Sequence, residues 1–273
     1  MKNILKAIII GGGSIGKRHS SNLNNLGIST RIVDIDEINN IDNILKEGFD
    51  IGLICSPNVL HIEHCFKLVQ NNIPIFCEKP FYTSLEGVDE LLKVIKEKNL
   101  ITMVGCNLRF TDEVKQIDSN SNYINVYFGY NLKKWRPNTD HLKSYSANKF
   151  LGGGILLDAI HELDYLYYKF GNIKNISYIK SKLTDITIDT EDLVIGRIEF
   201  EKGTIADFTL NYLSEDYQRY YDILENNVLK RVYFNLNNKM YIDEIEYFVN
   251  QVKNKQHCIN NFEEANHLLK HLL

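Results

Sequence analysis

The chain has 273 residues, of which 44% are hydrophobic and 24% are charged, and its formal net charge at pH 7 is −4. This composition is typical of a folded globular protein and excludes a disordered chain, which lacks the apolar surface that offsets chain entropy. A nucleic-acid-binding protein usually carries a basic surplus or a basic stripe, and the sequence has neither. We expect one large or two modest domains and a small-molecule partner rather than nucleic acid.

No segment has the roughly 18 uninterrupted apolar residues that span a membrane. The first 19 residues are not expected to be a signal peptide, because their apolar run is short and Lys6 interrupts it. The five cysteines are odd in number and widely spaced, without a CxxC pair. This pattern indicates reduced, partly buried thiols in a cytoplasmic protein, and we expect no metal site.

The first part of the chain alternates short apolar runs with amphipathic stretches. Strands are expected over 6–10, 30–34, 51–55, 73–77 and 101–105, and helices over 14–26, 59–70 and 84–98. Several of the strands are rich in Ile and Val with little polar alternation, which is typical of a parallel sheet covered on both faces. The alternation of strand and helix predicts an N-terminal α/β domain with a doubly wound parallel sheet, the Rossmann fold.

The pattern changes after about residue 120. Strands are expected over 122–130, 176–183, 192–200, 204–211 and 228–234, a loop over 131–150, and helices over 155–170, 240–253 and 261–273. Successive strands predict a C-terminal α+β domain with a mostly antiparallel, open sheet. We place the domains at 1–118 and 119–273, with the C-terminal helices as a segment able to pack back on the first domain.

A glycine-rich turn joins the first expected strand to the first helix. Gly11-Gly12-Gly13-Ser14-Ile15-Gly16 satisfies the GxGxxG pattern in the required context. Glycines there let the backbone turn tightly and approach a pyrophosphate, which rests on the helix N-terminus. The sequence therefore predicts cofactor contacts at Gly11, Gly13, Ser14, Ile15 and Gly16. A tight structural turn or a methyltransferase-type nucleotide site is the alternative.

Asp34 lies at the end of the next expected strand, 18 residues beyond Gly16. A carboxylate at this place accepts hydrogen bonds from the adenosine ribose hydroxyls. It would repel a 2′-phosphate, so NAD is favoured over NADP as the cofactor. Asp36 is a second candidate for the same role.

Glu78-Lys79-Pro80 directly follows the fourth expected strand. The carboxyl ends of the strands in an open parallel sheet form the ligand crevice, so Lys79 is expected beside the nicotinamide. A lysine there can hydrogen-bond a reacting hydroxyl. A solvated surface lysine is the alternative.

With these motifs the chain resembles the glucose–fructose oxidoreductase/inositol dehydrogenase (Gfo/Idh/MocA) family of NAD(P)-dependent oxidoreductases. The resemblance covers nearly the whole chain and rests on an ordered set of motifs: the glycine turn, Cys55-Ser56-Pro57-Asn58 with His61 and His64, Glu78-Lys79-Pro80, Gly105-Cys106-Asn107-Leu108-Arg109-Phe110, and Gly152-Gly153-Gly154 with Asp158 and His161. Members mostly oxidise or reduce carbons of sugars, polyols and sugar nucleotides. Their open C-terminal sheet often mediates oligomers, which implies a homo-oligomer here.

The resemblance also implies roles for individual residues. Lys79 and His161 match the catalytic lysine and histidine, and Asp158 matches an aspartate of the same group. The cofactor contacts implied are Ser56, Pro57, Asn58, His61, Glu78, Lys79 and Asn107, and the substrate contacts are Arg109 and His161.

One departure concerns Asp158 and His161, which are three residues apart, whereas four is usual in much of the family. On one helix both spacings keep the pair on one face, but their orientation shifts. For His161 itself, a helix histidine with a structural hydrogen bond is the alternative to catalysis.

The polar, aromatic loop before the triple glycine is a candidate substrate segment, with Lys134, Trp135, Arg136 and Tyr145 as its contacts. Arginine binds carboxylate or phosphate through two hydrogen bonds, and a Trp face can stack on a sugar. A solvated loop whose Trp packs on the domain is an equal alternative. The chain is shorter than is usual in the family after Tyr221, which predicts a smaller sheet.

The sequence therefore predicts an NAD-dependent oxidoreductase that transfers a hydride between the nicotinamide and a hydroxyl or keto carbon of a sugar, polyol or nucleotide sugar. The reacting hydroxyl is expected between Lys79 and His161. Two alternatives stay open. One is an enzyme of epimerase or lyase type that oxidises its substrate transiently and retains NAD. The other is a non-catalytic NAD(H)-binding sensor or partner subunit.

Overall fold

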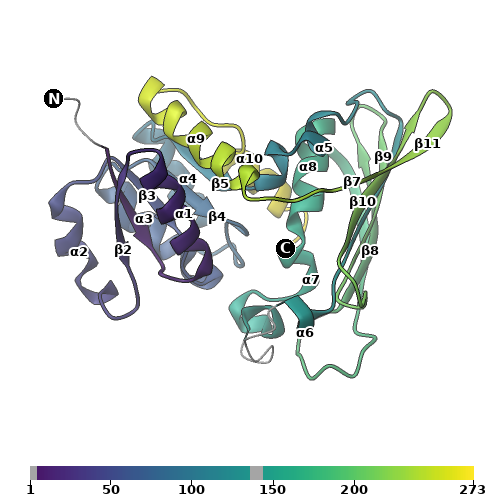
Figure 1. Ribbon diagram of the computed structural model, residues 1–273, viewed down its shortest axis with the longest axis horizontal. Coiled ribbons are helices and arrows are strands. Elements are labelled where there is room, and N and C mark those ends of the chain that lie inside the picture. The colour runs from purple at the N-terminus through teal and green to yellow at the C-terminus, as the bar shows by residue number, and fades with distance from the viewer. Residues whose placement is uncertain (1–4, 136–143) are drawn as a thin grey trace. The chain divides into compact units, whose positions relative to one another are not determined.

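The computed structural model describes residues 5–135 and 144–273. The chain divides into two units, each with its own sheet (Figure 1). Unit 1 comprises Met1–Asn107 and Asn238–Leu273, and unit 2 comprises Leu108–Asn237. Unit 1 is therefore built from both ends of the chain.

A five-stranded parallel sheet in the order β2-β1-β3-β4-β5 forms the centre of unit 1. Its strands are β1 (Lys6–Ile10), β2 (Ser29–Val33), β3 (Ile51–Ile54), β4 (Ile75–Glu78) and β5 (Thr102–Gly105). The residues of β3 and β5 are buried throughout, which explains why their sequences show no polar alternation. The predicted Rossmann-type parallel sheet is confirmed.

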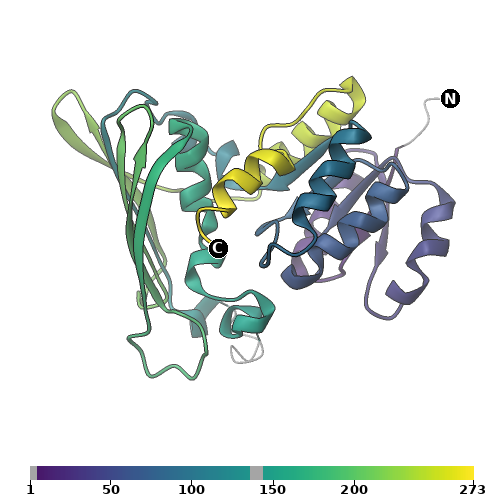
Figure 2. The same ribbon diagram turned by 180° about the vertical axis from the view of Figure 1, so that it is seen from behind.

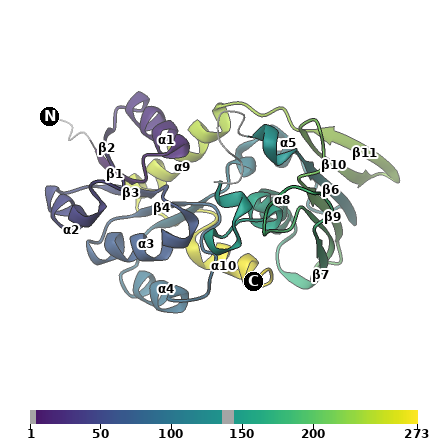
Figure 3. The same ribbon diagram turned by 90° about the horizontal axis from the view of Figure 1, so that it is seen from below.

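Helices cover both faces of this sheet (Figure 3). On one face α1 (Ser14–Asn25) packs against α9 (Lys239–Asn254), and on the other α3 (His61–Gln70) packs against α4 (Val88–Glu97). The last helix, α10 (Phe262–Leu269), lies beside β5, where Phe262 N donates to Thr102 Oγ1 at 3.2 Å. The C-terminal helices thus complete the layers around the N-terminal sheet.

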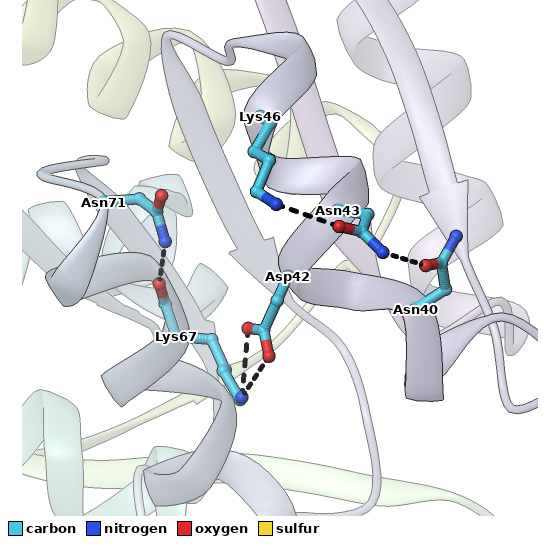
Figure 4. A network of polar contacts seen from close by, with 6 residues as sticks. All are labelled: Asn40, Asp42, Asn43, Lys46, Lys67 and Asn71. Atoms are coloured by element: carbon cyan, nitrogen blue, oxygen red, sulfur yellow. Dashed lines mark hydrogen bonds and ion pairs between the residues drawn. The ribbon is translucent and has the colours of Figure 1, made fainter.

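The segment after β2 contains a short helix, α2 (Ile41–Ile44), which the sequence analysis did not predict. Figure 4 shows how polar side chains connect it to α3: Lys67 Nζ contacts both carboxylate oxygens of Asp42, at 3.0 and 2.9 Å. Asn43 bridges Asn40 and Lys46 in the same figure. These contacts are exposed, so they orient the segment and contribute little to stability.

Unit 2 is built on a six-stranded sheet in the order β11-β10-β6-β9-β8-β7. Its strands are β6 (Tyr123–Gly129), β7 (Ile173–Ser181), β8 (Leu193–Phe200), β9 (Ile205–Asn211), β10 (Gln218–Glu225) and β11 (Val228–Tyr233). All neighbouring pairs are antiparallel except β6 and β9, which are parallel. The predicted mostly antiparallel sheet is confirmed.

The sheet includes a full strand, β10, that the sequence analysis did not predict. Two of its buried positions are charged: Arg219 pairs with Glu162, and Asp222 pairs with Arg231. These charges hide the hydrophobic alternation by which strands are recognised.

Helices lie along one face of the unit 2 sheet (Figures 1 and 2). They are α7 (Ile155–Asp158), which contacts β8 and β9, and α8 (Ile160–Phe170), which contacts β6. The shorter helices of the unit are α5 (Asp112–Lys115) and α6 (Leu132–Trp135). In the described part of the chain no helix covers the opposite face of the sheet. Within residues 5–135 and 144–273, none of the helices is long and apolar enough to cross a membrane.

Candidate functional site

The glycine turn between β1 and α1 combines tight packing with one open position. Gly11 has a φ of +109°, and a Cβ on it would lie 2.4 Å from Cys55 O. A Cβ on Gly16 would lie 2.0 Å from Gly11 O, whereas one on Gly13 would meet nothing within 4 Å. Gly13 precedes the first turn of α1, which has no side-chain cap and no acidic residue. The backbone N–H groups of that turn are therefore available to an anion.

Asp34 follows β2 and lies against this turn. A Cβ on Gly12 would stand 2.4 Å from Asp34 Oδ2, so the carboxylate covers the glycine directly. The other carboxylate oxygen, Oδ1, accepts from Ile35 N at 2.9 Å. This placement beside the glycine turn favours Asp34 over Asp36 as the ribose ligand.

Two histidines of α3 hold the loop that follows β3. His61 is fully buried, with Nδ1 2.8 Å from Pro80 O and Nε2 3.0 Å from Ser56 O. His64 Nδ1 lies 2.8 Å from Ser56 Oγ. Burial lowers the pKa of both histidines. Since both ring nitrogens of His61 face carbonyl oxygens of the protein, the geometry favours a role in fixing two loops over a direct cofactor contact.

Asn58, in the loop after Pro57, is buried, and its Nδ2 has no hydrogen-bond partner among the described residues. A buried donor left without a partner costs about 1–3 kcal/mol, so this amide group is suited to donate to a bound ligand. A dinucleotide needs N–H donors for its pyrophosphate and a carboxylate for its ribose, and the open turn at Gly13 and Asp34 supply them. The residues present therefore fit NAD.

Lys79 follows β4, and its neighbour Glu78 is connected to the glycine-turn helix. Glu78 Oε1 lies 2.6 Å from Nε2 of His19, a fully buried residue of α1. The His19 ring meets the rings of Phe76 and Tyr241 edge-on, at 5.2 and 6.4 Å between centroids. The end of β4 is thus fixed to α1. The sequence analysis missed His19, whose only signal is its place three residues after Gly16.

The negative charge of Glu78 affects the pKa values of neighbouring groups. Burial, followed by this charge, raises the pKa of Cys55 and of Tyr241. Asn107, a predicted cofactor contact, is buried and hydrogen-bonded to Tyr241. All five cysteines are buried thiols outside any disulfide. The described residues contain no group of three or more His, Cys, Asp or Glu side chains that could hold a metal ion.

In unit 2 the expectation of one helix over 155–170 was wrong. The structure has two helices: α7 ends at Asp158, and α8 begins at Ile160. The residue between them, Ala159, has φ −99° and ψ 27°, and its carbonyl accepts from Glu162 N, a three-residue bond instead of the four-residue bond of an α-helix. Asp158 and His161 therefore do not share the face of one continuous helix.

Asp158 is buried and bonded to a tyrosine from another element. Its Oδ2 accepts from Tyr212 OH at 2.5 Å, and Tyr212, which directly follows β9, is fully buried. Burial, and then the charge of Asp158, raises the pKa of Tyr212 well above its usual value. The sequence analysis missed Tyr212, because no motif marks it. His161 lies in the first turn of α8 and is partly exposed.

Arg109 forms a buried, bidentate ion pair within unit 2. Its Nε lies 2.7 Å from Asp164 Oδ2, and its Nη2 lies 2.8 Å from Asp164 Oδ1. A second buried pair joins Arg219 Nε to Glu162 Oε1 at 2.7 Å. The geometry favours a structural role for Arg109 over the substrate contact implied by the resemblance.

The segment before the triple glycine is described only in part. Trp135 is half-buried among Phe128, Tyr130 and Tyr212, with ring centroids 5.4, 6.3 and 6.0 Å away, and Lys134 pairs with Glu215. This arrangement favours the alternative in which Trp135 packs on the domain. Arg136 lies outside the described residues.

The triple glycine packs tightly against its neighbours. A Cβ on Gly153 would lie 2.1 Å from the carbonyl oxygen of Tyr145, and one on Gly154, which has a φ of +115°, would lie 2.5 Å from Glu191 Oε1. The same carboxylate oxygen accepts from Leu156 N at 3.2 Å and so holds the start of α7. The glycines thus serve the placement of α7, and Tyr145 lies at this packing contact.

Two family models match the chain, one in each unit. A model described as "Oxidoreductase family, NAD-binding Rossmann fold" matches residues 29–106. A model described as "GFO/IDH/MocA C-terminal domain" matches residues 124–225. The first range contains strands β2 to β5 of unit 1, and the second contains β7 to β10 and most of β6 in unit 2.

The curated proteins that resemble this chain have low sequence identity to it. The uncharacterized oxidoreductase YrbE of Bacillus subtilis is 26% identical over 231 residues, which cover 72% of this chain and 64% of YrbE. The 2,7-anhydro-N-acetylneuraminate hydratase of Escherichia coli is 27% identical over 165 residues, which cover 58% of this chain and 44% of the hydratase. The chain thus spans less than two thirds of the length of these relatives.

Among solved structures, the fold is shared with a myo-inositol 2-dehydrogenase from Lactobacillus plantarum. The TM-score is 0.81 at 20% sequence identity, and the match covers 98% of this chain and 95% of the other. The two chains therefore have the same arrangement of elements over nearly their whole length.

Proposed function

Because this chain belongs to the GFO/IDH/MocA family of oxidoreductases, we propose that it is an NAD-dependent oxidoreductase acting on a sugar, polyol or nucleotide sugar. It would transfer a hydride between the nicotinamide and a hydroxyl or keto carbon of that substrate. The observation that carries this proposal lies in unit 1. Lys79 follows the carboxyl end of β4, and Glu78 beside it is hydrogen-bonded to the helix whose N-terminus is open to a pyrophosphate.

The residues of unit 1 account for cofactor binding. The backbone of Gly13, Ser14 and Ile15 at the start of α1 would hold the pyrophosphate, since this helix end has no cap of its own. Asp34 would accept the ribose hydroxyls, and the Nδ2 group of Asn58 would donate to the cofactor. When bound, the nicotinamide supplies the hydride acceptor or donor.

Lys79 and His161 would perform the proton chemistry. In the oxidation, His161 takes the proton of the substrate hydroxyl as a general base, and the Lys79 ammonium donates a hydrogen bond to the oxygen as negative charge develops on it. In the reverse reaction His161 returns the proton as a general acid, and Lys79 donates the same hydrogen bond to the carbonyl oxygen. Asp158 would be the third residue of the catalytic group, together with Lys79 and His161.

Substitution of either residue tests the proposal. We expect Lys79→Ala and His161→Ala each to lower turnover by about two to four orders of magnitude, because each removes a proton-transfer or charge-stabilising group. Affinity for NADH, measured by calorimetry, should stay nearly unchanged. His267→Ala, which changes an exposed histidine of α10, is the control and should keep full turnover. Full turnover in both test variants would refute the assignment.

A second candidate function is favoured by the hydratase relative, since hydration causes no net oxidation of the substrate. In that case the substrate is oxidised transiently and the cofactor stays bound. The two candidates differ in one result: the first accumulates free NADH, and the second converts its substrate without NADH release. A sensor or partner subunit would turn over no substrate.

We further propose that the chain forms a homo-oligomer through the uncovered face of the unit 2 sheet. That face carries Ile195, which is 43% exposed, and a stacked pair of tyrosines, Tyr127 and Tyr220, with ring centroids 5.0 Å apart. Analytical ultracentrifugation tests this, and a monomer would contradict it. The five buried cysteine thiols support a cytoplasmic location, where thiols stay reduced.

A further inference from the structure

We propose that Tyr212 is a positioning residue for the reaction, which holds the Asp158 carboxylate in its working orientation. The inference rests on the proposed function, because that function gives Asp158 its place beside His161 in the catalytic group. It assigns a task to a side chain that no sequence motif marks.

The contact joins two buried groups from distant parts of unit 2. Tyr212 OH lies 2.5 Å from Asp158 Oδ2, and the two side chains belong to residues that are 0% and 3% exposed. The tyrosine is itself fixed, since its backbone N donates to Asp192 O at 2.8 Å and its ring meets Trp135 edge-on at 6.0 Å. An anchor held at both backbone and ring can fix the carboxylate that it contacts.

The direction of this hydrogen bond follows from the chemistry of the two groups. Burial raises the pKa of Tyr212 well above its usual value, so the phenol keeps its proton and donates it. Asp158 Oδ2 is the acceptor, and a length of 2.5 Å is characteristic of a hydroxyl bonded to a carboxylate. Tyr212 therefore holds the Oδ2 atom of Asp158 in a fixed direction.

The interruption of the helix explains why Asp158 needs an external anchor. α7 ends at Asp158, and the backbone bonds change register at Ala159 before α8 begins. The α8 helix that carries His161 therefore does not fix the direction of the Asp158 side chain. The hydroxyl group of Tyr212 supplies a constraint on that direction from another element, the end of β9.

The test compares two tyrosine variants of unit 2. Tyr212→Phe removes only the hydroxyl that reaches Asp158. Tyr221→Phe is the matched control, because Tyr221 is also buried and its hydroxyl donates to Glu113 O at 2.8 Å. We expect similar falls in Tm for both variants, a loss of about 10- to 100-fold in kcat for Tyr212→Phe alone, and unchanged affinity for NADH. A purely structural role would lower kcat equally in both variants or in neither.

A double variant shows whether Tyr212 acts through Asp158. If it does, Asp158→Asn combined with Tyr212→Phe will be no slower than Asp158→Asn alone. Independent, multiplying losses in kcat would overturn the inference, as would full kcat in Tyr212→Phe. Absence of turnover in the unchanged chain is a different result, since it contradicts the proposed function and removes the inference with it.

Discussion

Asp34, the proposed ribose ligand, would select between the two cofactors by its charge. Its Oδ2 stands over Gly12, so a ribose placed at the glycine turn would meet the carboxylate. Hydroxyl groups donate to a carboxylate, whereas a 2′-phosphate brings a like charge to it and is repelled. In the proposed function, the preference for NAD would thus depend on the charge of Asp34.

Replacing Asp34 should weaken this preference. We expect Asp34→Ser to raise the Kd for NADH by about 10- to 100-fold, because hydrogen bonds to a charged group are lost, and to reduce the discrimination against NADPH. Calorimetric titration with both cofactors measures the two effects. Asp36→Ser is the matched control and should leave both affinities unchanged. If Asp36→Ser has the larger effect, the ribose ligand is misassigned.

The sequence analysis could select candidate residues that belong to a local motif. It could not select residues whose partners are distant in the sequence. The glycine turn, Asp34 and Lys79 have fixed places relative to strands and helices in the sequence. Tyr212 reaches Asp158 across 54 residues, and His19 reaches Glu78 across 59. Such partners are brought together only by the tertiary fold, which leaves no local pattern to read.

At the scale of elements, α3 organises the loops of unit 1 through two histidines on one face. His61 lies between carbonyl oxygens of Ser56 and Pro80, and His64 holds the hydroxyl of Ser56. The helix thereby ties the loop after β3 to the loop after β4. Because both histidines are buried, protonation of either ring would place a positive charge in the interior. The arrangement of these loops therefore depends on pH.

This dependence predicts a loss of stability in mild acid. Burial lowers the pKa of His61 and His64 in the folded chain, whereas histidines of the unfolded chain have a pKa of about 6.5. The unfolded chain thus binds more protons below that value, so stability that is present above about pH 6.5 is lost as the pH falls through the lowered pKa values.

Thermal unfolding at pH 7.5 and at pH 5 measures this loss as a fall in Tm. We expect His64→Gln to show a smaller fall, because it removes one titrating group and retains a hydrogen-bonding side chain. His257→Gln, which changes an exposed histidine, should behave as the unchanged chain does. An equal fall in Tm for the unchanged chain, His64→Gln and His257→Gln would show that His64 does not contribute to the loss of stability in acid.

The elements also show where sequence patterns mislead. The continuous apolar pattern over 155–170 contains neither Gly nor Pro, so nothing in it marks the interruption at Ala159. Strand β10 was hidden for the opposite reason, since a buried Arg219 occupies a position where a hydrophobic residue is expected. Trp135 fitted both a substrate-stacking and a packing interpretation, and only its aromatic neighbours favour one of them.

At the scale of the whole molecule, the chain returns to its first unit after building the second. Helix α9 places Phe248 against Phe76 of β4, with ring centroids 5.7 Å apart, so the C-terminal segment contributes to the core of unit 1. Its amphipathic pattern predicts a packed helix but does not specify which sheet it covers. The division at Asn107 and Asn238 is therefore a tertiary property.

The central claim is that this chain transfers a hydride between its nicotinamide cofactor and a carbinol carbon of a sugar-like substrate. The most direct measurement supplies NAD with sugars, polyols and nucleotide sugars deuterated at their carbinol carbons, and then examines the nicotinamide by mass spectrometry after denaturation. We expect deuterium in the nicotinamide with at least one substrate, whether the NADH is released or retained, and labelling about two to four orders of magnitude slower in the Lys79→Ala variant. An unlabelled cofactor with every member of the panel would contradict the account.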